Sequence, residues 1–201
     1  MNNSGIGLAC STTTLYYTSN SGKNWTPTTL TPVKTPAASG YYYSQVFVTQ
    51  TGSSYVGVSN SIDVISRTAS YIYKSNDFFN TSSTQHYNIS SSNMGFFSFA
   101  SNGFGIVMIY NTGSYFYNST SWSGLVNSNS SYCSISDNGK YSLGPYGSTL
   151  YYSTNITSSG VPSLSANVSP RNLNGFSCIG NNGLGIMHDN TSGFQYIYII
   201  H

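Results

Sequence analysis

The stretch "LYYTSNSGKNWTP" (residues 15–27) joins an aromatic run, a polar turn with one glycine, and a tryptophan. Aromatic residues bounded by Gly, Asn and Ser are typical of a β-strand that runs into a hairpin. Whether this hairpin occurs once or is repeated decides the fold.

The same order of features recurs along the chain. A glycine-containing turn is followed by a short apolar run and then by an aromatic run such as "YIYKS", "YFYNS" or "LYYST". The turn glycines lie 36 to 51 residues apart, at Gly5, Gly52, Gly103, Gly139 and Gly183. Blades of β-propellers take about 40 to 50 residues. Because no segment has a helical period, we predict an all-β fold, a single β-propeller domain over residues 1–201.

Five repeats predict five blades of mostly four antiparallel strands. The first copy lacks an inner strand and the last lacks an outer one. A six-bladed alternative stays open if residues 26–45 contain a further hairpin. The predicted repeat units are 1–43, 44–94, 95–130, 131–173 and 174–201.

The turn after the first aromatic run resembles the Asp-box (BNR) motif of β-propellers, with asparagine where that family prefers aspartate. The matching residues are Thr18, Asn20, Gly22 and Trp25. In the other copies Asn76 and Asn155 keep the Asn/Asp position, but glycine is missing. The resemblance implies a structural turn between the third and fourth strands of a blade.

The chain contains very few charged residues. Charged residues make up 5% of the chain, against roughly 25% in typical soluble domains. The six scattered Lys and Arg residues form no basic cluster of the kind that nucleic-acid binding requires. The N-terminus has no signal-peptide pattern, and the apolar runs are too short to span a bilayer. A neutral hydroxyl- and amide-rich surface favours a location outside the cell.

This composition predicts weak dependence of stability on acid. The chain has four Asp and no Glu, so few carboxylates are protonated as the pH falls. We expect the thermal midpoint to change little between neutral pH and about pH 3. A fall of many degrees in a pH series of thermal melts would show that aspartates anchor the fold.

Cysteines and cofactor motifs point to no bound group. Cys10, Cys133 and Cys178 form no CxxC pair, so no zinc motif is present. One disulfide or three buried thiols are both compatible with their spacing. We predict no cofactor and no metal.

The residues that known hydrolytic mechanisms require are largely missing from the chain. Asp-box propellers include sialidases, which need an arginine triad and a glutamate, whereas this chain has only Arg67 and Arg171 and no Glu. Glycoside hydrolysis needs two acidic side chains, and Asp77 and Asp137 fall in predicted turns. His188 beside Asp189 is read as a turn. We therefore predict that the chain is not an enzyme and has no catalytic residues.

The sequence offers candidate residues both for binding glycans and for covalent glycosylation. Trp25 and Trp122 are candidate stacking platforms in a propeller lectin, with a structural role as the alternative for both. Nine Asn-x-Ser/Thr sequons are present, including one at Asn2. The candidate glycosylation sites are Asn24, Asn80, Asn88, Asn118, Asn129, Asn155, Asn167 and Asn190.

In composition, size and predicted architecture the chain resembles tail nozzle and tail-associated proteins of spindle-shaped archaeal viruses. The resemblance implies a non-enzymatic virion protein that forms a ring and contacts adaptor and spike proteins. Its expected partners are other tail proteins, copies of itself and host surface glycans, with no nucleic acid and no membrane insertion. A glycan-binding lectin or extracellular surface protein is the alternative.

Overall fold

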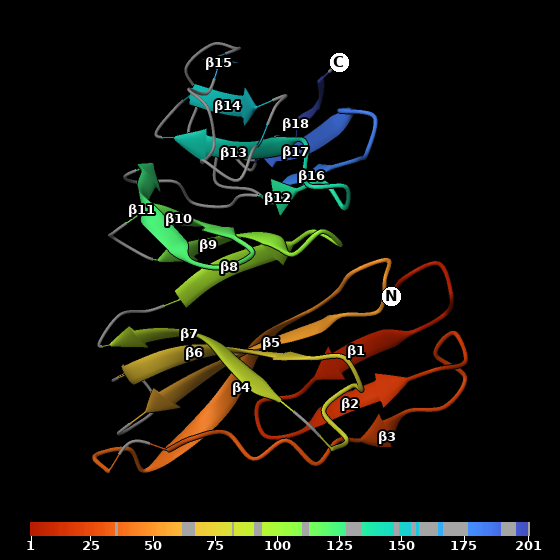
Figure 1. Cartoon of the computed structure of the whole chain (residues 1–201), viewed down its shortest axis with the longest axis vertical. Helices are drawn as coiled ribbons and strands as arrows, with labels where there is room; N and C mark the ends of the chain where they lie inside the picture. Colours follow the sequence, from red (N-terminus) through yellow and green to blue (C-terminus); the bar gives the residue numbers. More distant parts are fainter. Residues whose placement is uncertain are drawn as a thin grey trace. The chain divides into compact units, whose positions relative to one another are not determined.

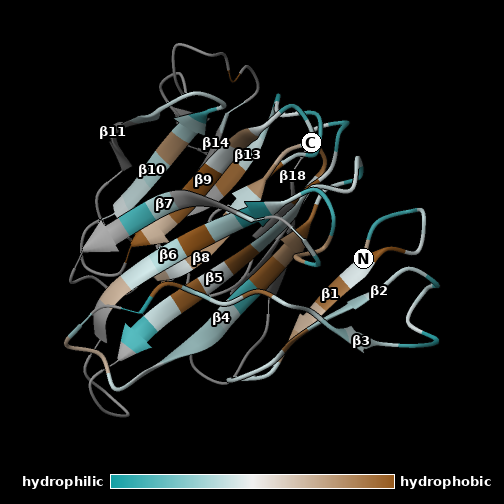
Figure 2. Cartoon of the chain, turned by 60° about the horizontal axis from the view of Figure 1, so that its bottom comes forward, coloured by the Kyte–Doolittle hydropathy of each residue, from teal (hydrophilic) through white to brown (hydrophobic). Residues whose placement is uncertain are grey.

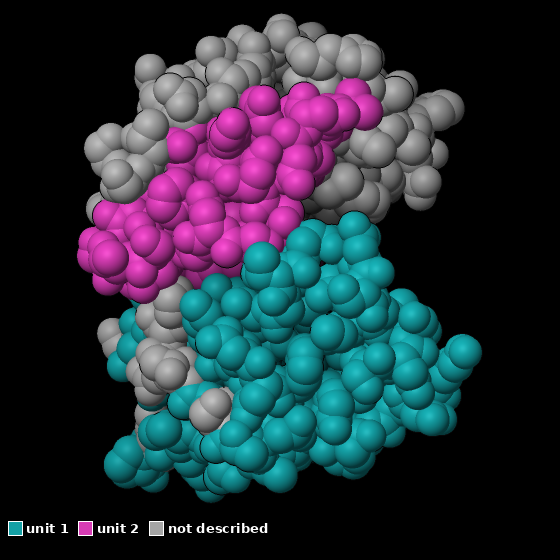
Figure 3. Space-filling model, turned by 45° about the vertical axis from the view of Figure 1, so that its right-hand side comes forward, with its two compact units in different colours: residues 1–94 teal, residues 95–201 magenta. Residues whose placement is uncertain are grey.

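The computed structural model describes residues 1–34, 36–61, 67–81, 83–90, 94–109, 113–127, 134–146, 149–153, 156, 165–166, 177–189 and 196–200. Every helix or strand element in these ranges is a β-strand, which confirms the all-β prediction. Over the same residues, no helix has the length and hydropathy that a membrane span needs. The chain divides into two compact units, residues 1–94 and 95–201, which are described separately (Figure 3).

Unit 1 contains two antiparallel sheets in which each strand pairs with the next one along the chain (Figure 1). The first sheet consists of β1 (Gly7–Cys10), β2 (Leu15–Thr18) and β3 (Thr26–Pro27). The second consists of β4 (Gly40–Val48), β5 (Ser54–Ser61), β6 (Arg67–Ser75) and β7 (Thr84–Ser90).

Unit 2 contains three further sheets of the same kind. They are β8 (Met94–Phe99), β9 (Phe104–Ile109), β10 (Gly113–Asn118) and β11 (Trp122–Asn127); β12 (Ser134–Ile135), β13 (Ser142–Tyr146), β14 (Thr149–Ser153) and β15 (Ser165–Ala166); and β16 (Ser177–Ile179), β17 (Gly185–Asp189) and β18 (Tyr196–Ile200).

The glycine turns mark equivalent points in the five sheets of the described residues. Each glycine turn lies just before the second strand position of its sheet, and all five glycines have a positive φ. The angles are 77° at Gly5, 92° at Gly52, 90° at Gly103, 72° at Gly139 and 82° at Gly183. Glycine adopts this left-handed conformation without the steric cost that a Cβ imposes. The periodic glycines therefore reflect a repeated turn.

Within each unit, side chains of neighbouring sheets form a buried core. In unit 1 β1 lies against β4, and one core joins side chains of the two sheets, among them Leu8, Leu15, Val56 and Phe79. In unit 2 a second cluster joins Ile106 and Phe116 of one sheet to Ile135 of the next. Figure 2 shows hydrophobic residues along the strands and hydrophilic residues in the turns.

Residues 28–39, called the strap, connect β3 to β4. The Val33 amide donates to the Tyr73 hydroxyl over 2.9 Å, and the Asn60 side chain donates to the Val33 carbonyl over 3.1 Å. The Tyr43 hydroxyl donates to the Leu30 carbonyl over 3.2 Å. Apart from residue 35, the strap is described and holds no further hairpin, which the six-bladed alternative required.

Two details of the predicted repeats can be compared with the strands. In the described residues the first and last sheets have three strands each, and β1 occupies the second-strand position. The predicted boundary between 43 and 44 falls inside β4, which begins at Gly40. The tyrosine run and the apolar run that follows it belong to one strand, with a register shift between Tyr43 and Gln45.

Candidate functional site

In each unit, two sets of turns lie at one end of the sheets, which is called the turn end of that unit. The first set joins the first and second strand positions, and the second set joins the third and fourth. In the first sheet the Ser21 amide donates to the Gly5 carbonyl over 2.8 Å. In the second sheet the Ser53 hydroxyl donates to Asn76 Oδ1 over 3.1 Å. Each turn is therefore held by its neighbour as well as by its own residues.

Turns of neighbouring sheets are also joined in unit 1. Asn2 is buried, and its amide nitrogen donates to the carbonyls of Thr49 and Gln50, both over 3.4 Å. The Asn3 amide donates to the Gln50 side-chain oxygen over 2.9 Å. These contacts tie the turn before β1 to the turn between β4 and β5.

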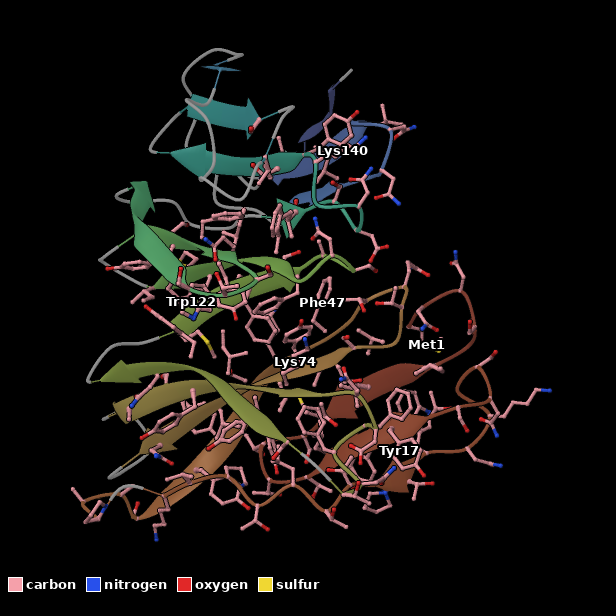
Figure 4. The ribbon with its side chains drawn as sticks, viewed as in Figure 1. Met1, Tyr17, Phe47, Lys74, Trp122 and Lys140 are labelled. Atoms are coloured by element: carbon pink, nitrogen blue, oxygen red, sulfur yellow. The ribbon has the colours of Figure 1, made fainter. Side chains whose placement is uncertain are left out.

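In unit 2 a row of turns runs across three sheets. Asn102 Nδ2 donates to the Asn138 carbonyl over 3.3 Å, and the Asn138 amide donates to Asn181 Oδ1 over 2.7 Å. The Ser101 hydroxyl adds a bond of 2.6 Å to Asp137 Oδ1. We call Asn102, Asn138 and Asn181 the asparagine row. Figure 4 labels Lys140, which directly follows the turn at Asn138 and is exposed.

The asparagine row was not identified from the sequence. Its residues were read only as the polar positions of separate hairpins. A sequence signal exists, since a Ser, Asp or Asn residue and then an Asn precede the turn glycine in "SNG", "DNG" and "NNG". A pattern within one hairpin does not show that neighbouring hairpins bind each other.

The turn that resembles the Asp-box is organised around Thr18, which is buried at the end of β2. Its hydroxyl donates to Asn20 Oδ1 over 2.9 Å and accepts from the Gly22 amide over 3.1 Å. Asn20 Oδ1 also accepts from the Asn24 amide over 2.9 Å. Side chains thereby satisfy the turn backbone, which is a structural role.

The second copy of this turn differs from the prediction. Asn76 was expected at the Asn/Asp position, but Asp77 occupies it: the Ser75 hydroxyl donates to Asp77 Oδ1 over 2.5 Å, and the Thr81 amide donates to Asp77 Oδ2 over 2.8 Å. The Phe79 amide donates to the Ser75 hydroxyl over 3.0 Å, as Gly22 does to Thr18. Phe79 takes the place of the glycine with a φ of 63°.

The length of the run before the turn explains the shift. Ser75, which corresponds to Thr18, follows the four residues 71–74, whereas Thr18 follows the three residues 15–17, so the Asn/Asp position comes one residue later than an alignment of the two aromatic runs predicts. Phe79 is 2% exposed and belongs to the core of unit 1. Burial of its ring offsets the strain of a left-handed conformation at a residue with a Cβ.

We expect that hydrogen-bond acceptance at Asp77 matters more than its charge. Asp77→Ala should lower the free energy of unfolding by about 1–2 kcal/mol, because the turn donors lose their acceptor. Asp77→Asn should cost less than about 1 kcal/mol, because Asn20 makes the equivalent contacts. Urea unfolding of both variants, with Asn20→Asp as the matched control, measures the difference. Equal losses in the alanine and asparagine variants would show that the negative charge is required.

The third and fourth copies are less similar to the motif. The Asn118 side-chain oxygen accepts from the Thr120 and Ser121 amides over 3.1 and 2.8 Å, which closes a shorter turn. Asn155, predicted at the fourth copy, lies outside the described residues.

The two tryptophans lie in different environments. Trp25 follows the turn that begins at Thr18, and 41% of its surface is exposed. Trp122 lies on β11, half-buried, with its ring centroid 5.0 Å from that of Tyr117 and 6.5 Å from that of Phe99 (Figure 4). Of the two predicted platforms, Trp25 thus offers the freer ring.

The sequons also separate by environment. Asn24 and Asn88 have exposed side chains. Asn2 is buried, and Asn80 is half-buried and donates through its amide nitrogen to the Asp77 carbonyl over 3.0 Å. Asn118 is half-buried in its turn. The remaining candidates lie outside the described residues: Asn129, Asn155, Asn167 and Asn190.

The titratable groups are engaged in structural contacts or lie apart from one another. Asp77 and Asp137 both accept hydrogen bonds in turns, Asp77 in unit 1 and Asp137 in unit 2. In the part of the chain that is described, no group of three or more His, Cys, Asp or Glu side chains is placed to hold a metal ion. Cys10 is a free thiol whose pKa is raised by burial. Arg171 and Cys133 lie outside the described residues, as do the side chains of Arg67, Cys178, His188 and Asp189.

Comparison with known proteins establishes the fold. No protein-family model matches the sequence, and no curated protein matches it. Among solved structures, YCF48 bound to a D1 peptide superposes with a TM-score of 0.55 at 13% identity, over 94% of this chain and 58% of that one. An ancestral GH74 enzyme gives 0.60 at 9% identity, over 98% and 29%. The β-propeller domain of Cps50 (Swd1) from Myceliophteria thermophila gives 0.58 at 10% identity, over 99% and 68%.

The chain has a β-propeller fold. At these identities the likeness concerns the fold alone. This chain spans 58% of the length of the YCF48 chain and 29% of that of the GH74 chain.

The prediction that the chain is not an enzyme was wrong. Its structural neighbours include a GH74 enzyme, so the same architecture carries catalysis. The prediction considered the catalytic residues of sialidases and a pair of catalytic carboxylates. Active sites built on one fold differ in residues and chemistry, so the lack of these two sets of residues excludes two mechanisms and not enzymes in general.

Proposed function

We propose that this propeller is a binding and assembly module of a virion tail or an outer surface, and that the turn end of unit 2 contacts its protein partners, including copies of itself. The asparagine row carries the proposal. Its side chains are held between neighbouring turns, while Asn181 of the row and the adjacent Asn182 and Lys140 are exposed. Preorganised polar groups lose little conformational freedom when a partner binds, which favours recognition.

Two other observations support this function. The surface carries few charges, with 5% charged residues and a formal net charge of +2, as expected for contacts that tolerate acidic or extracellular conditions. The neighbouring YCF48 structure contains a bound peptide, so a propeller of similar fold accepts a polypeptide ligand.

The oligomeric state tests the proposal directly. We expect the purified chain to form rings or larger assemblies, detected by light scattering and negative-stain imaging. A chain that stays monomeric at high concentration, with or without the other tail proteins, would contradict the proposal.

A pair of matched variants locates the contact face. Leu184 is 38% exposed at the turn end of unit 2, and Val33 is 54% exposed on the strap. Leu184→Asp should weaken assembly while leaving the thermal midpoint unchanged, because it places a charge in the proposed interface. Val33→Asp, an equivalent change on the strap, should leave assembly intact. The reverse result would place the interface on the strap.

Glycan recognition is a second candidate, favoured by the exposure of Trp25. An exposed indole ring beside polar side chains is a suitable surface for stacking against a sugar. A glycan array with the native chain and with Trp25→Ala tests it. Binding that the variant retains, or no binding by either protein, would exclude Trp25 as a platform.

A further inference from the structure

The asparagine of the sequon at Asn24 is exposed, whereas Asn2 is buried and Asn80 and Asn118 are half-buried. Asn24, Trp25 and Thr26 are all exposed. They lie where the turn after β2 leads into β3, a strand of only two residues. An enzyme that modifies Asn24 can therefore approach the complete acceptor sequence.

The turn engages Asn24 through its backbone. The Asn24 amide of the main chain donates to Asn20 Oδ1 over 2.9 Å, and Thr18 holds Asn20 in place. The side chain of Asn24 projects from a fixed backbone position. Substitution of its amide nitrogen leaves the bonds of Thr18 and Asn20 intact.

Two other sequons are used by the fold itself. Asn2 is 7% exposed and donates through its amide nitrogen to two carbonyls, those of Thr49 and Gln50. Asn80 donates through its amide nitrogen to the Asp77 carbonyl. A sugar on either nitrogen would displace hydrogen bonds that close a turn or join two sheets.

Asn88 is exposed but lies within β7, where it is paired with Tyr71 of β6. The ladder holds its backbone extended. An acceptor sequence in this strand cannot bend into an enzyme without breaking strand pairs.

We propose that Asn24 is an acceptor for N-linked glycosylation, and that the folded structure makes Asn2 and Asn80 inaccessible to the transferase. The donor is a lipid-phosphate-linked oligosaccharide, and the partner is an oligosaccharyltransferase. The amide nitrogen of Asn24 forms a C–N bond with the anomeric carbon while the C–O bond to phosphate breaks. The phosphate leaves with the electron pair, and the amide gives up one proton.

This modification would change the surface around Trp25. A bulky polar glycan on the adjacent residue covers an exposed indole and adds to the neutral hydroxyl-rich surface. The inference is independent of the proposed assembly function, since it requires only access to the transferase.

The test compares the folded chain with its own peptides. Purified protein is incubated with a single-subunit oligosaccharyltransferase and a lipid-linked oligosaccharide, and occupancy is measured by peptide mass spectrometry. Synthetic peptides carrying each sequon provide the reference rate. We expect Asn24 to react in the folded chain as its peptide does. Asn2 and Asn80 should react at least about tenfold more slowly than their peptides, because their turns must open first.

Two results would overturn the proposal. One is an unmodified Asn24 in folded protein whose peptide reacts. The other is modification of Asn2 or Asn80 as readily as Asn24, each relative to its peptide. Thr26→Ala removes the acceptor sequence but keeps Asn24 and Trp25, and should abolish the product. Asn24→Gln keeps Trp25 for the glycan array, so covalent attachment and lectin binding are distinguished.

Discussion

Replacing Gly139 by alanine is expected to lower the free energy of unfolding by about 2–5 kcal/mol. Gly139 has a φ of 72°, a conformation that costs a residue with a Cβ about 1–2 kcal/mol. The new methyl group would also overlap the side chain of Asn102. Asn102 would have to move and give up its bonds to Asn138 and Phe104, each worth about 0.5–1.5 kcal/mol.

Gly52→Ala is the matched control for this change. Gly52 has a φ of 92°, but a Cβ added there meets no atom within 4 Å. Only the backbone cost of about 1–2 kcal/mol applies. Urea unfolding of the two variants should therefore differ by the contribution of the turn-to-turn contact at Asn102. Equal losses would mean that this contact adds nothing to stability.

Alkaline solution is expected to destabilise the protein steeply. Burial raises the pKa of Tyr43, and the neighbouring Tyr41 raises it further. Burial also raises the pKa of Tyr73, although the Val33 amide that donates to its hydroxyl partly opposes this. Both hydroxyls hold the strap. The folded state thus keeps protons that the unfolded chain releases near pH 10.

The direction of the effect follows from proton binding. Because the folded-state pKa is higher, the stability that these tyrosines contribute is complete below about pH 10 and is lost as the pH rises above it. Each tyrosine that stays protonated contributes a slope of up to about 1.4 kcal/mol per pH unit. Thermal melts between neutral pH and about pH 11.5 should show this loss.

Phenylalanine variants assign the alkaline effect. Tyr43→Phe should cost about 1 kcal/mol at neutral pH, because the bond to the Leu30 carbonyl is lost. The stability of this variant should then fall less steeply above pH 10, because it lacks the Tyr43 hydroxyl, which keeps its proton in the folded state and loses it in the unfolded state. An unchanged slope in Tyr43→Phe and in Tyr73→Phe would assign the alkaline loss to other groups.

The local features of the fold were predictable because they depend on neighbouring residues in the chain. The five glycine turns, the strand after each one and the turn around Thr18 follow from positive φ and short-range hydrogen bonds. The Asn/Asp position of the second copy was misplaced by one residue. It comes one residue later because the run before the turn is one residue longer in β6 than in β2, and a buried Phe79 in a left-handed conformation takes the place of the glycine, which depends on packing.

The candidate site was less accessible to prediction. The exposure of Trp25 and the half-burial of Trp122 depend on which rings lie nearby, such as Tyr117 and Phe99. The sequons at Asn2, Asn24 and Asn80 look equivalent in the sequence. Only their hydrogen bonds separate an exposed acceptor from amides that the fold uses.

By itself the sequence determined that the chain repeats, that its elements are β-strands, and that few of its groups carry charge. These properties depend on the composition and on short-range patterns, which can be read directly from the sequence. The tertiary structure alone decided that Asn102, Asn138 and Asn181 join three sheets. It also decided that the side chain of Asn2 is buried and hydrogen-bonded while that of Asn24 is exposed. The physical reason is that hydrogen bonds between turns about 36 to 48 residues apart form only after the sheets have packed side by side.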